Sequence, residues 1–375
     1  MEEATRKKPT RRERRIERKI REAKKEEQQL AKYEEWKKRN EEEARNNRDP
    51  EKHRDFHAYQ ARKFEKFWND AYSSHYGRFE DNTSIPCKRY TVNPAPYGGC
   101  QRDTLQVFSV KVTELTGGLQ WPLDVFGMVA LRDSLDQNRN IVFKRERGNC
   151  QTLTAEVRII FLTYQLQPLL LFILSVHLIS YILSDPYLLL TGPVRGVVRG
   201  GPVTFEVSLY AKGTTESDDK ELNLVASSMG KCWSHLWDSY LMTQSYTSRL
   251  STLDFKLGHT ASSVEATITV QAISVPRPDG FHGRFAAVAG LDEEFVLLDS
   301  QDENVPISGD EIRLSRRVAT VEFSEMLEIS VKAWQGGRVF RGGMHFAPRE
   351  MGTDFQTIDI DFCKIKVTVD WSLFP

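Results

Sequence analysis

Alternating apolar and polar residues recur along the chain from residue 105 to its end. Five segments combine this alternation with many β-branched side chains, and they lie at 105–115, 202–213, 263–273, 318–334 and 363–374. Alternation with a period of two, interrupted by Gly, Pro, Asp and Asn, is typical of half-buried strands joined by turns. Because no helical pattern separates these segments, we predict a mainly β protein built as an antiparallel β-sandwich.

The strand-rich part contains a weak internal repeat. The first copy runs through SVKV, DVFG, IVFKR, LLLTGPVRGVV and FEVSLYA, and the second runs in the same order through TITV, DGFHG, FVLLD, IRLSRRVATV and LEISVKA. The repeat leaves open whether the chain builds one large sandwich or two in tandem, with a C2-like layout as one option. No run of Gly, Ser or Pro separates the copies, so we expect a single body in which residues 264–270 pair with a strand of the first copy.

The chain before the strands has a different pattern. Residues 1–53 are dominated by Arg, Lys and Glu, and their thin apolar stripe runs only from Ile16 to Leu30. This predicts a charged helical segment that buries little, either solvated and partly disordered or forming a weak coiled coil. Residues 54–104 form an aromatic-rich helical and linker segment, whose aromatic face we expect to dock on a neighbouring domain. The β-sandwich domain then covers 105–375.

One apolar stretch fits none of these patterns. Residues 159–184 contain no charged side chain, and about 20 apolar residues are enough to span a bilayer. A single-pass membrane anchor is therefore one interpretation. However, the stretch separates two parts of the first repeat copy, and strands of one sheet cannot pair across a membrane. We favour the interpretation that 157–184 is an insert in a loop between strands, and keep the anchor as the alternative.

Composition narrows the class of protein only slightly. The 375 residues include 52 basic and 52 acidic side chains, but the first 70 residues hold 23 Lys and Arg against 17 Asp and Glu. Because acidic residues interleave with this basic excess, nucleic-acid binding is disfavoured. Five widely spaced cysteines and the lack of an apolar leader predict an intracellular protein with reduced thiols, cytoplasmic or nuclear, with a single-pass membrane location as the alternative.

Motifs for catalysis and cofactor binding are missing from the sequence. It has no nucleophile elbow, no zinc-protease motif, no phosphate-binding loop with its Lys-Ser or Lys-Thr ending, and no dinucleotide fingerprint. We therefore expect a protein that is not an enzyme and needs no cofactor. The hypothesis that we favour is an interaction module that binds a protein partner.

The alternative function is a C2-like sandwich that binds calcium or lipid. For this alternative the candidate calcium ligands are Asp124, Asp133 and Asp136, because calcium takes about six to eight oxygen ligands, often from neighbouring loops. A looser second set in the other repeat copy consists of Asp292, Asp299 and Asp302. Acidic residues in loops are ordinarily solvated turn formers, so we favour the interpretation that these positions hold no metal.

Several phrases of the sequence resemble one family. They are LQVFSVKV, LQWPLDVFGMVALRD, NRNIVFKR, NCQTL, DPYLLLTGPVRGVV, VTFEVSLYAKG, SSVEATITVQ and VTVDWSLF. Together they resemble the domain of unknown function 6598 family of uncharacterised grass proteins, over approximately residues 54–375. In that family the NCQTL phrase runs almost directly into the DPYLLLTGP phrase, so the resemblance implies that 157–184 is an addition, such as a translated intron would produce. Some members are joined to ribosome-inactivating N-glycosidase domains, which implies an association with defence or with carbohydrate binding.

Overall fold

The computed structural model describes residues 56–94, 98–155, 185–230, 238–274, 280–301, 303–360 and 363–375, and these form a mainly antiparallel β structure. This confirms the predicted fold class. The α-helix in this part of the chain is α3 (Phe56–Tyr76). The strands are β1 (Arg102–Leu115), β2 (Leu123–Arg132), β3 (Asn140–Arg145), β4 (Gln151–Leu153), β5 (Val197–Val198), β6 (Val203–Ala211), β7 (Lys220–Met229), β8 (Tyr240–Thr247), β9 (Ser251–Ser274), β10 (His282–Ala289), β11 (Glu294–Asp299), β12 (Ile307–Ser308), β13 (Glu311–Ile312), β14 (Val318–Glu322), β15 (Leu327–Gln335), β16 (Arg338–Phe346), β17 (Met351–Asp359) and β18 (Lys364–Ser372).

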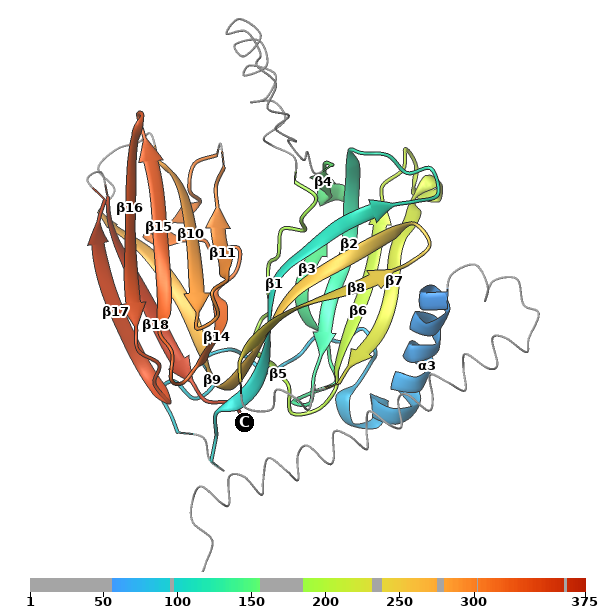
Figure 1. The fold of residues 1–375 in the computed structure, drawn as a ribbon, viewed down its shortest axis with the longest axis horizontal. Helices are drawn as coiled ribbons and strands as arrows, with labels where there is room; N and C mark the ends of the chain where they lie inside the picture. Colours follow the sequence, from blue (N-terminus) through green and yellow to red (C-terminus); the bar gives the residue numbers. More distant parts are fainter. Residues whose placement is uncertain are drawn as a thin grey trace, which may run out of the picture.

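The first half of the β structure is a sandwich of two layers (Figure 1). One layer has the strand order β3-β2-β6-β7, with β4 paired to the start of β2. The facing layer consists of β5, β1, the first part of β9 and β8. Successive residues of a strand point to opposite faces, so alternate apolar residues meet between the layers. Val110, Val207 and Phe255 are fully buried in this first core.

The second half is a sandwich of the same kind. Its four-stranded layer has the order β11-β10-β15-β16, and its other layer consists of β14, the second part of β9, β18 and β17. Ile268, Phe285, Ile329 and Trp371 are buried in a second core that is separate from the first.

Strand β9 belongs to both sandwiches and runs for 24 residues. Its residues 251–263 pair with β1, whereas residues 263–274 pair with β14 and β18. The prediction that residues 264–270 pair with the first copy is therefore wrong, because they pair with strands of the second copy. The preceding residues of the same strand make the connection to the first copy, since β9 is long enough to run out of one core and into the next.

The two sandwiches repeat one strand topology. The strands β1, β2, β3, β6 and β7 of the first correspond to the second part of β9, β10, β11, β15 and β16 of the second. Likewise, β5 and β14 lie beside β1 and β9, and β8 pairs with β9 as β17 pairs with β18. The internal repeat is confirmed, and it takes the form of two tandem sandwiches that share β9.

Helix α3 packs on the outer face of the first sandwich (Figure 1). Phe64 and Trp68 of the helix contact Phe79 and the β7 residue Ala226. Trp68 is fully buried, and its Nε1 donates a hydrogen bond to the Gln137 carbonyl over 2.9 Å. The prediction that the aromatic face of this segment docks on a neighbouring domain is confirmed.

Two predictions concern residues outside the described part of the chain, namely the charged segment 1–53 and the insert 157–184. The residues that flank the insert are described. Thr154 N donates to the Asp185 carbonyl over 3.2 Å, and Asp185 N donates to Thr154 Oγ1 over 2.7 Å. Thr154 and Asp185 therefore form a hydrogen-bonded neck between the two described segments. Among the described residues, no helix combines the length and the apolar character needed to cross a membrane.

Candidate functional site: the cleft between the sandwiches

The three aspartates proposed as calcium ligands lie at the two ends of one strand. Asp124 is at the start of β2 and Asp133 follows its last residue, so about nine residues of extended chain, roughly 30 Å, separate them. Asp124 Oδ1 accepts a hydrogen bond from Thr152 Oγ1 over 2.6 Å. Asp133 and Asp136 lie together at the other end. In the described ranges, no group of three or more His, Cys, Asp or Glu side chains is arranged to hold a metal ion.

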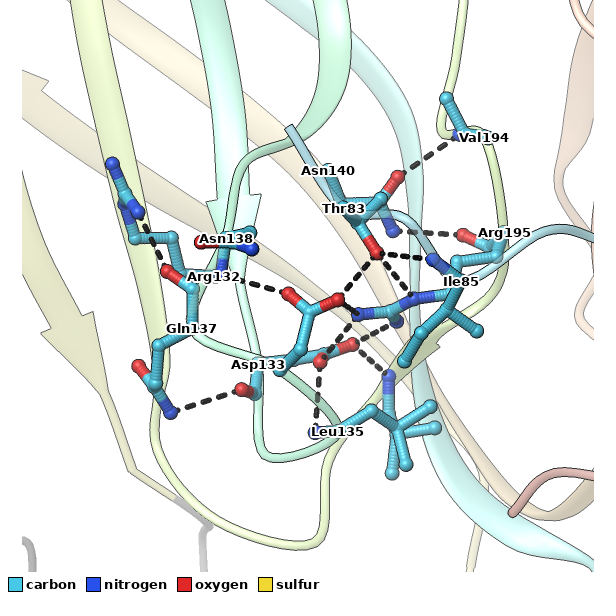
Figure 2. A network of polar contacts seen from close by, with 12 residues as sticks. Thr83, Ile85, Arg132, Asp133, Leu135, Gln137, Asn138, Asn140, Val194 and Arg195 are labelled. Carbon is cyan, nitrogen blue, oxygen red and sulfur yellow. Dashed lines mark hydrogen bonds and ion pairs between the residues drawn. The ribbon is translucent and has the colours of Figure 1, made fainter. Parts of the chain in front are cut away.

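Asp133 and Asp136 belong to a buried polar network at the end of β2. Figure 2 shows this network around Asp133 and Arg195. Asp133 forms a bidentate ion pair with Arg195, in which Nη1 and Nη2 lie 2.5 and 2.9 Å from the two carboxylate oxygens. Burial lowers the pKa of Arg195, but the charge and hydrogen bonds of Asp133 outweigh it and raise that pKa. Asp136 accepts a hydrogen bond from Thr83 Oγ1 over 2.6 Å. The network thus joins β2 to two segments distant in sequence.

A second buried network joins β2 and β6 to helix α3. Glu206 on β6 accepts hydrogen bonds from Arg132 Nε (2.8 Å) and Arg139 Nη2 (2.5 Å). The Arg132 guanidinium lies 4.3 Å from the ring centroid of Phe79 and 5.1 Å from that of Trp68. Breaking one partner of such a buried pair typically costs about 3–5 kcal/mol. Because the charges in both networks are satisfied internally, we assign the networks to support of the fold.

An open cleft of about 940 Å³ lies between the two sandwiches. Its first wall is the segment 185–190, which is held against β1 by the hydrogen bond from Leu188 N to the Val110 carbonyl, 2.9 Å long. Its second wall is β11 with the turn that follows it. Ligand sites typically measure about 300–1,000 Å³ and occur preferentially between domains. We take this inter-sandwich cleft as the candidate functional site.

Carboxylates line both walls of the inter-sandwich cleft. Asp185 lies on the first wall, and Glu293, Glu294, Asp299 and Glu303 lie on the second. Burial and the charge of Asp299 raise the pKa of Asp185 above its ordinary value, although a backbone hydrogen bond to the carboxylate opposes them. Asp299 therefore acts on Asp185 across the cleft. A cation bound in the inter-sandwich cleft would favour the ionised form of both carboxyl groups.

Two basic side chains of the cleft are already paired. Lys256 Nζ lies 2.6 Å from Glu293 Oε2. Arg284 lies 2.6 Å from Glu294 and 3.4 Å from Asp299. These contacts are partly exposed and individually weak. Even with these ion pairs, the inter-sandwich cleft is lined by more carboxylates than cations.

Arg316 ties the two sandwiches together at the cleft. It precedes β14 of the second sandwich and donates hydrogen bonds to three carbonyls of the first, those of Val107 (2.6 Å), Gly192 (2.9 Å) and Phe108 (3.3 Å). Its guanidinium also lies 5.2 Å from the ring centroid of Phe295. Burial lowers the pKa of Arg316 to about 10, which leaves the side chain charged at neutral pH.

Apolar side chains accompany the carboxylates. Tyr187 and Leu189 on the first wall remain 40% and 41% exposed. Lys111 Nζ lies 5.5 Å from the Tyr187 ring centroid, which is within range of a cation–π contact. The inter-sandwich cleft thus combines excess negative charge with accessible apolar surface.

The sequence predicts only part of this site. Asp299 belongs to the looser calcium set, whereas Asp292 of that set lies in the turn before β11 and Asp302 lies outside the described residues. Asp185 is not among the predicted residues, because it directly follows the apolar stretch and carries no motif. The phrase DPYLLL, which places a carboxylate beside apolar residues at the end of that stretch, is the signal that points to it.

The fold and the cleft define a class, a tandem antiparallel β-sandwich protein with a charged groove between its two bodies. A family model described as "Domain of unknown function (DUF6598)" matches residues 104–172 and 176–369. The chain belongs to this family. The match is divided at 173–175, inside the apolar stretch, so the proposed foreign origin of 157–184 stays a prediction. No curated protein matches the chain.

Solved structures give only distant similarities. The human GIVD cytosolic phospholipase A2 is 8% identical, with a TM-score of 0.23, over 74% of this chain and 30% of the enzyme. The calcium-bound tandem C2 domains of extended-synaptotagmin 2 are 11% identical, also with a TM-score of 0.23, over 74% of this chain and 100% of theirs. The chain thus spans less than a third of the phospholipase that it matches. At these TM-scores nothing about fold or function is transferred.

Proposed function

We propose that this protein is a non-enzymatic interaction module whose inter-sandwich cleft binds a cationic, partly apolar segment of a partner protein. The proposal rests on the placement of Asp185 and Asp299 on opposite walls of the inter-sandwich cleft, each contributed by a different sandwich. A positively charged side chain between them would relieve their mutual repulsion, and would be attracted from a distance by the surrounding carboxylates.

The other side chains of the inter-sandwich cleft fit the same kind of ligand. Tyr187 and Leu189 offer apolar contact next to Asp185, and Tyr187 can also stack on a cation. Lys256 is already paired with Glu293, and Arg284 is already paired with Glu294. An incoming Lys or Arg would compete with these two side chains for the same carboxylates. An anionic ligand would instead meet a surplus of like charge.

The alternatives are less well supported by the described residues. Calcium binding through Asp124, Asp133 and Asp136 lacks a point at which the three converge. The single-pass anchor concerns 157–184, outside the described part of the chain, and the association with defence rests on family context alone. These stay predictions, as does a cytoplasmic or nuclear location.

The proposal is tested with a fluorescein-labelled peptide of alternating Lys and Leu residues, titrated with the full chain. We expect saturable binding that weakens as salt is added, because charge contributes to it. The double variant Asp185→Asn/Glu303→Gln should weaken binding about tenfold, equivalent to about 1.4 kcal/mol. Asp185→Asn preserves the oxygen that accepts the hydrogen bond from Tyr187 N, 2.8 Å away.

The matched control is Glu350→Gln, which neutralises an exposed carboxylate just before β17, outside the residues that line the inter-sandwich cleft. It should leave the affinity unchanged. A second control is the same peptide with Glu in place of Lys, which should not bind in the cleft. Equal effects of the cleft variant and of Glu350→Gln on binding of the Lys-Leu peptide would rule the cleft out as the site.

A further inference from the structure

Three cations lie side by side across the outer face of the second sandwich. Arg284 on β10 is the direct cross-strand partner of Lys332 on β15, and Lys332 is the direct partner of Arg341 on β16. Like charges directly opposite each other destabilise a sheet. The arrangement therefore costs stability in the isolated protein, and an external anionic group would remove that cost.

Only one of the three cations is neutralised within the described residues. Arg284 is paired with Glu294 and Asp299 at the β11 edge. Lys332 and Arg341 are exposed, and no ion pair joins either of them to a carboxylate in the part of the chain that the structure describes. The uncompensated charge therefore lies on β15 and β16, away from the inter-sandwich cleft.

Aromatic and small residues flank this row of cations. On one side His282 is stacked on Trp334, with 5.8 Å between ring centroids, and Val339, the cross-strand partner of Trp334, is 58% exposed. On the other side Ser330 pairs with Gly343, and the exposed Glu328 side chain reaches over this glycine, with its Oε1 3.5 Å from where a Cβ atom of Gly343 would lie. The face offers apolar contact beside positive charge.

The first sandwich contains the equivalent face in an occupied state. There helix α3 covers β7, and Arg62 of the helix lies 3.5 Å from Glu221 of β7. The repeat aligns FEVSLYA of β6 with LEISVKA of β15, which makes Tyr210 equivalent to Lys332. Glu221 is the cross-strand partner of Tyr210, and Arg341 is the cross-strand partner of Lys332. Arg341 is therefore the counterpart of Glu221 in the second sandwich.

The sign of the charge is thus reversed between the two faces. A basic helix residue meets an acidic strand residue on the first sandwich, and a basic strand residue occupies the same place on the second. We propose that the outer face of β10, β15 and β16 docks an acidic, aromatic-bearing helix of a partner protein, as a charge-reversed counterpart of α3. Acidic residues three or four positions apart on a helix lie about 5–6 Å from each other. Neighbouring strands lie about 4.8 Å apart, so acidic side chains at this helical spacing can reach cations on neighbouring strands.

The probe is a labelled peptide with the α3 sequence, residues 56–76, in which Arg62, Lys63 and Lys66 are each replaced by Glu. The control peptide has the native α3 sequence. Fluorescence anisotropy with the full chain should give at least tenfold tighter binding of the acidic peptide. The double variant Lys332→Glu/Arg341→Glu should reverse this preference, because the face then carries the same sign as β7.

Matched variants separate this site from other surfaces. Lys220→Glu reverses an exposed cation on β7 of the first sandwich and should change neither affinity. Asp185→Asn in the inter-sandwich cleft should also have no effect, so failure of this proposal is distinguishable from failure of the proposed cleft function. If Lys332→Glu/Arg341→Glu does not fold, the corresponding double Gln variant, expected to reduce binding of the acidic peptide, takes its place.

Two outcomes would overturn the proposal. One is binding of the acidic peptide that is indifferent to Lys332 and Arg341. The other is absence of peptide binding while vesicles of phosphatidylcholine and phosphatidylserine bind in a manner that depends on the same two residues, which would assign the face to an anionic lipid surface.

Discussion

At the residue scale, close backbone approach and burial decide which substitutions the chain tolerates. Gly127 on β2 has a φ of +116°, and a Cβ atom there would lie 2.1 Å from the Ser208 carbonyl oxygen of β6. Gly118 also has a positive φ, +78°, but nothing lies within 4 Å of its added Cβ. The two positions therefore separate backbone strain from steric overlap.

We expect Gly127→Ala to lower the free energy of unfolding by about 2–5 kcal/mol. Left-handed strain contributes about 1–2 kcal/mol, and overlap with the neighbouring strand contributes about 1–3 kcal/mol. Chemical denaturation followed by circular dichroism measures the loss. Gly118→Ala is the control and should lose only the strain contribution, about 1–2 kcal/mol. Equal losses at the two positions would contradict the steric argument.

The raised pKa of Asp185 predicts how binding in the inter-sandwich cleft depends on pH. Burial and the charge of Asp299 favour the protonated carboxyl, so Asp185 takes up its proton at a higher pH than an ordinary aspartate. A cationic ligand favours the ionised form, so affinity should be complete above the raised pKa and fall as the pH drops through it. Affinity for the Lys-Leu peptide, measured between about pH 7 and about pH 4, gives the profile.

The same titration on Asp185→Asn tests the assignment. This variant lacks the titrating group and should show a flatter profile over the same range. Because the ionised form is the disfavoured one in the folded protein, Asp185→Asn should also not reduce stability at neutral pH. A profile as steep as that of the unsubstituted protein would mean that another carboxylate controls binding.

At the scale of single elements, the hydrogen-bonded neck at Thr154 and Asp185 joins the two described segments that flank the apolar stretch. The two backbone segments are hydrogen-bonded to each other at the points where the described chain stops before 156–184 and resumes after it. The strand pairings of β4 with β2, and of the 185–190 segment with β1, lie on the sandwich side of this neck. None of these contacts needs the residues between.

We expect deletion of 157–184 to keep the thermal midpoint or raise it. Loop-closure entropy changes by about 0.6 kcal/mol per doubling of loop length, so shortening the chain between Thr154 and Asp185 from 30 residues to 2, about four doublings, favours the folded state by about 2 kcal/mol. A change of that size raises the midpoint by about 5–10 °C in a chain this long. Differential scanning calorimetry measures it. Solubility should rise, because a large exposed apolar segment favours aggregation.

A large fall in the midpoint after deletion would show that the stretch contributes to the fold. Transcript sequencing gives a test of origin that does not depend on the protein. Reads that join the codons near Glu156 and Asp185 support the retained intron. Consistent retention in mature transcripts, together with protection of one flank in membranes, would restore the single-pass anchor.

At the scale of the whole molecule, the two sandwiches are coupled by a shared strand and by Arg316. Strand β9 supplies Phe255 to the first core and Ile268 to the second, so neither core is complete without it. Arg316 of the second sandwich satisfies three carbonyls of the first. Both features link the stability of the halves.

We therefore expect unfolding in a single cooperative transition. Val207→Ala on β6 and Ile329→Ala on β15 occupy equivalent positions in the two cores, and both residues are fully buried. Each should lower the free energy of unfolding of the entire protein by about 2–4 kcal/mol, through lost burial and the cavity left behind. Coincident fluorescence and circular dichroism curves in denaturant test this. Two resolved transitions, each affected by only one variant, would show that the sandwiches unfold independently.

The features predicted correctly from the sequence are those that depend on local periodicity. Alternation within the strand segments indicated which residues face a core, and the spacing of the aromatics in α3 indicated a docking face, because these patterns are fixed by strand and helix geometry alone. The similar order of apolar phrases in the two copies indicated the repeat. These predictions required no knowledge of which strands are neighbours.

Only the tertiary structure decided the strand pairing and the composition of the site. Residues 264–270 carry the same alternation whichever strand lies beside them, so the sequence could not determine that β9 passes from one core into the next. Asp185 and Asp299 lie far apart in the chain and come together only because the two sandwiches face each other across the cleft. Likewise, the cation row of Lys332 and Arg341 follows from the register of β15 with β16. Contacts between distant segments depend on packing of whole layers, and the pattern of any one segment does not encode that packing.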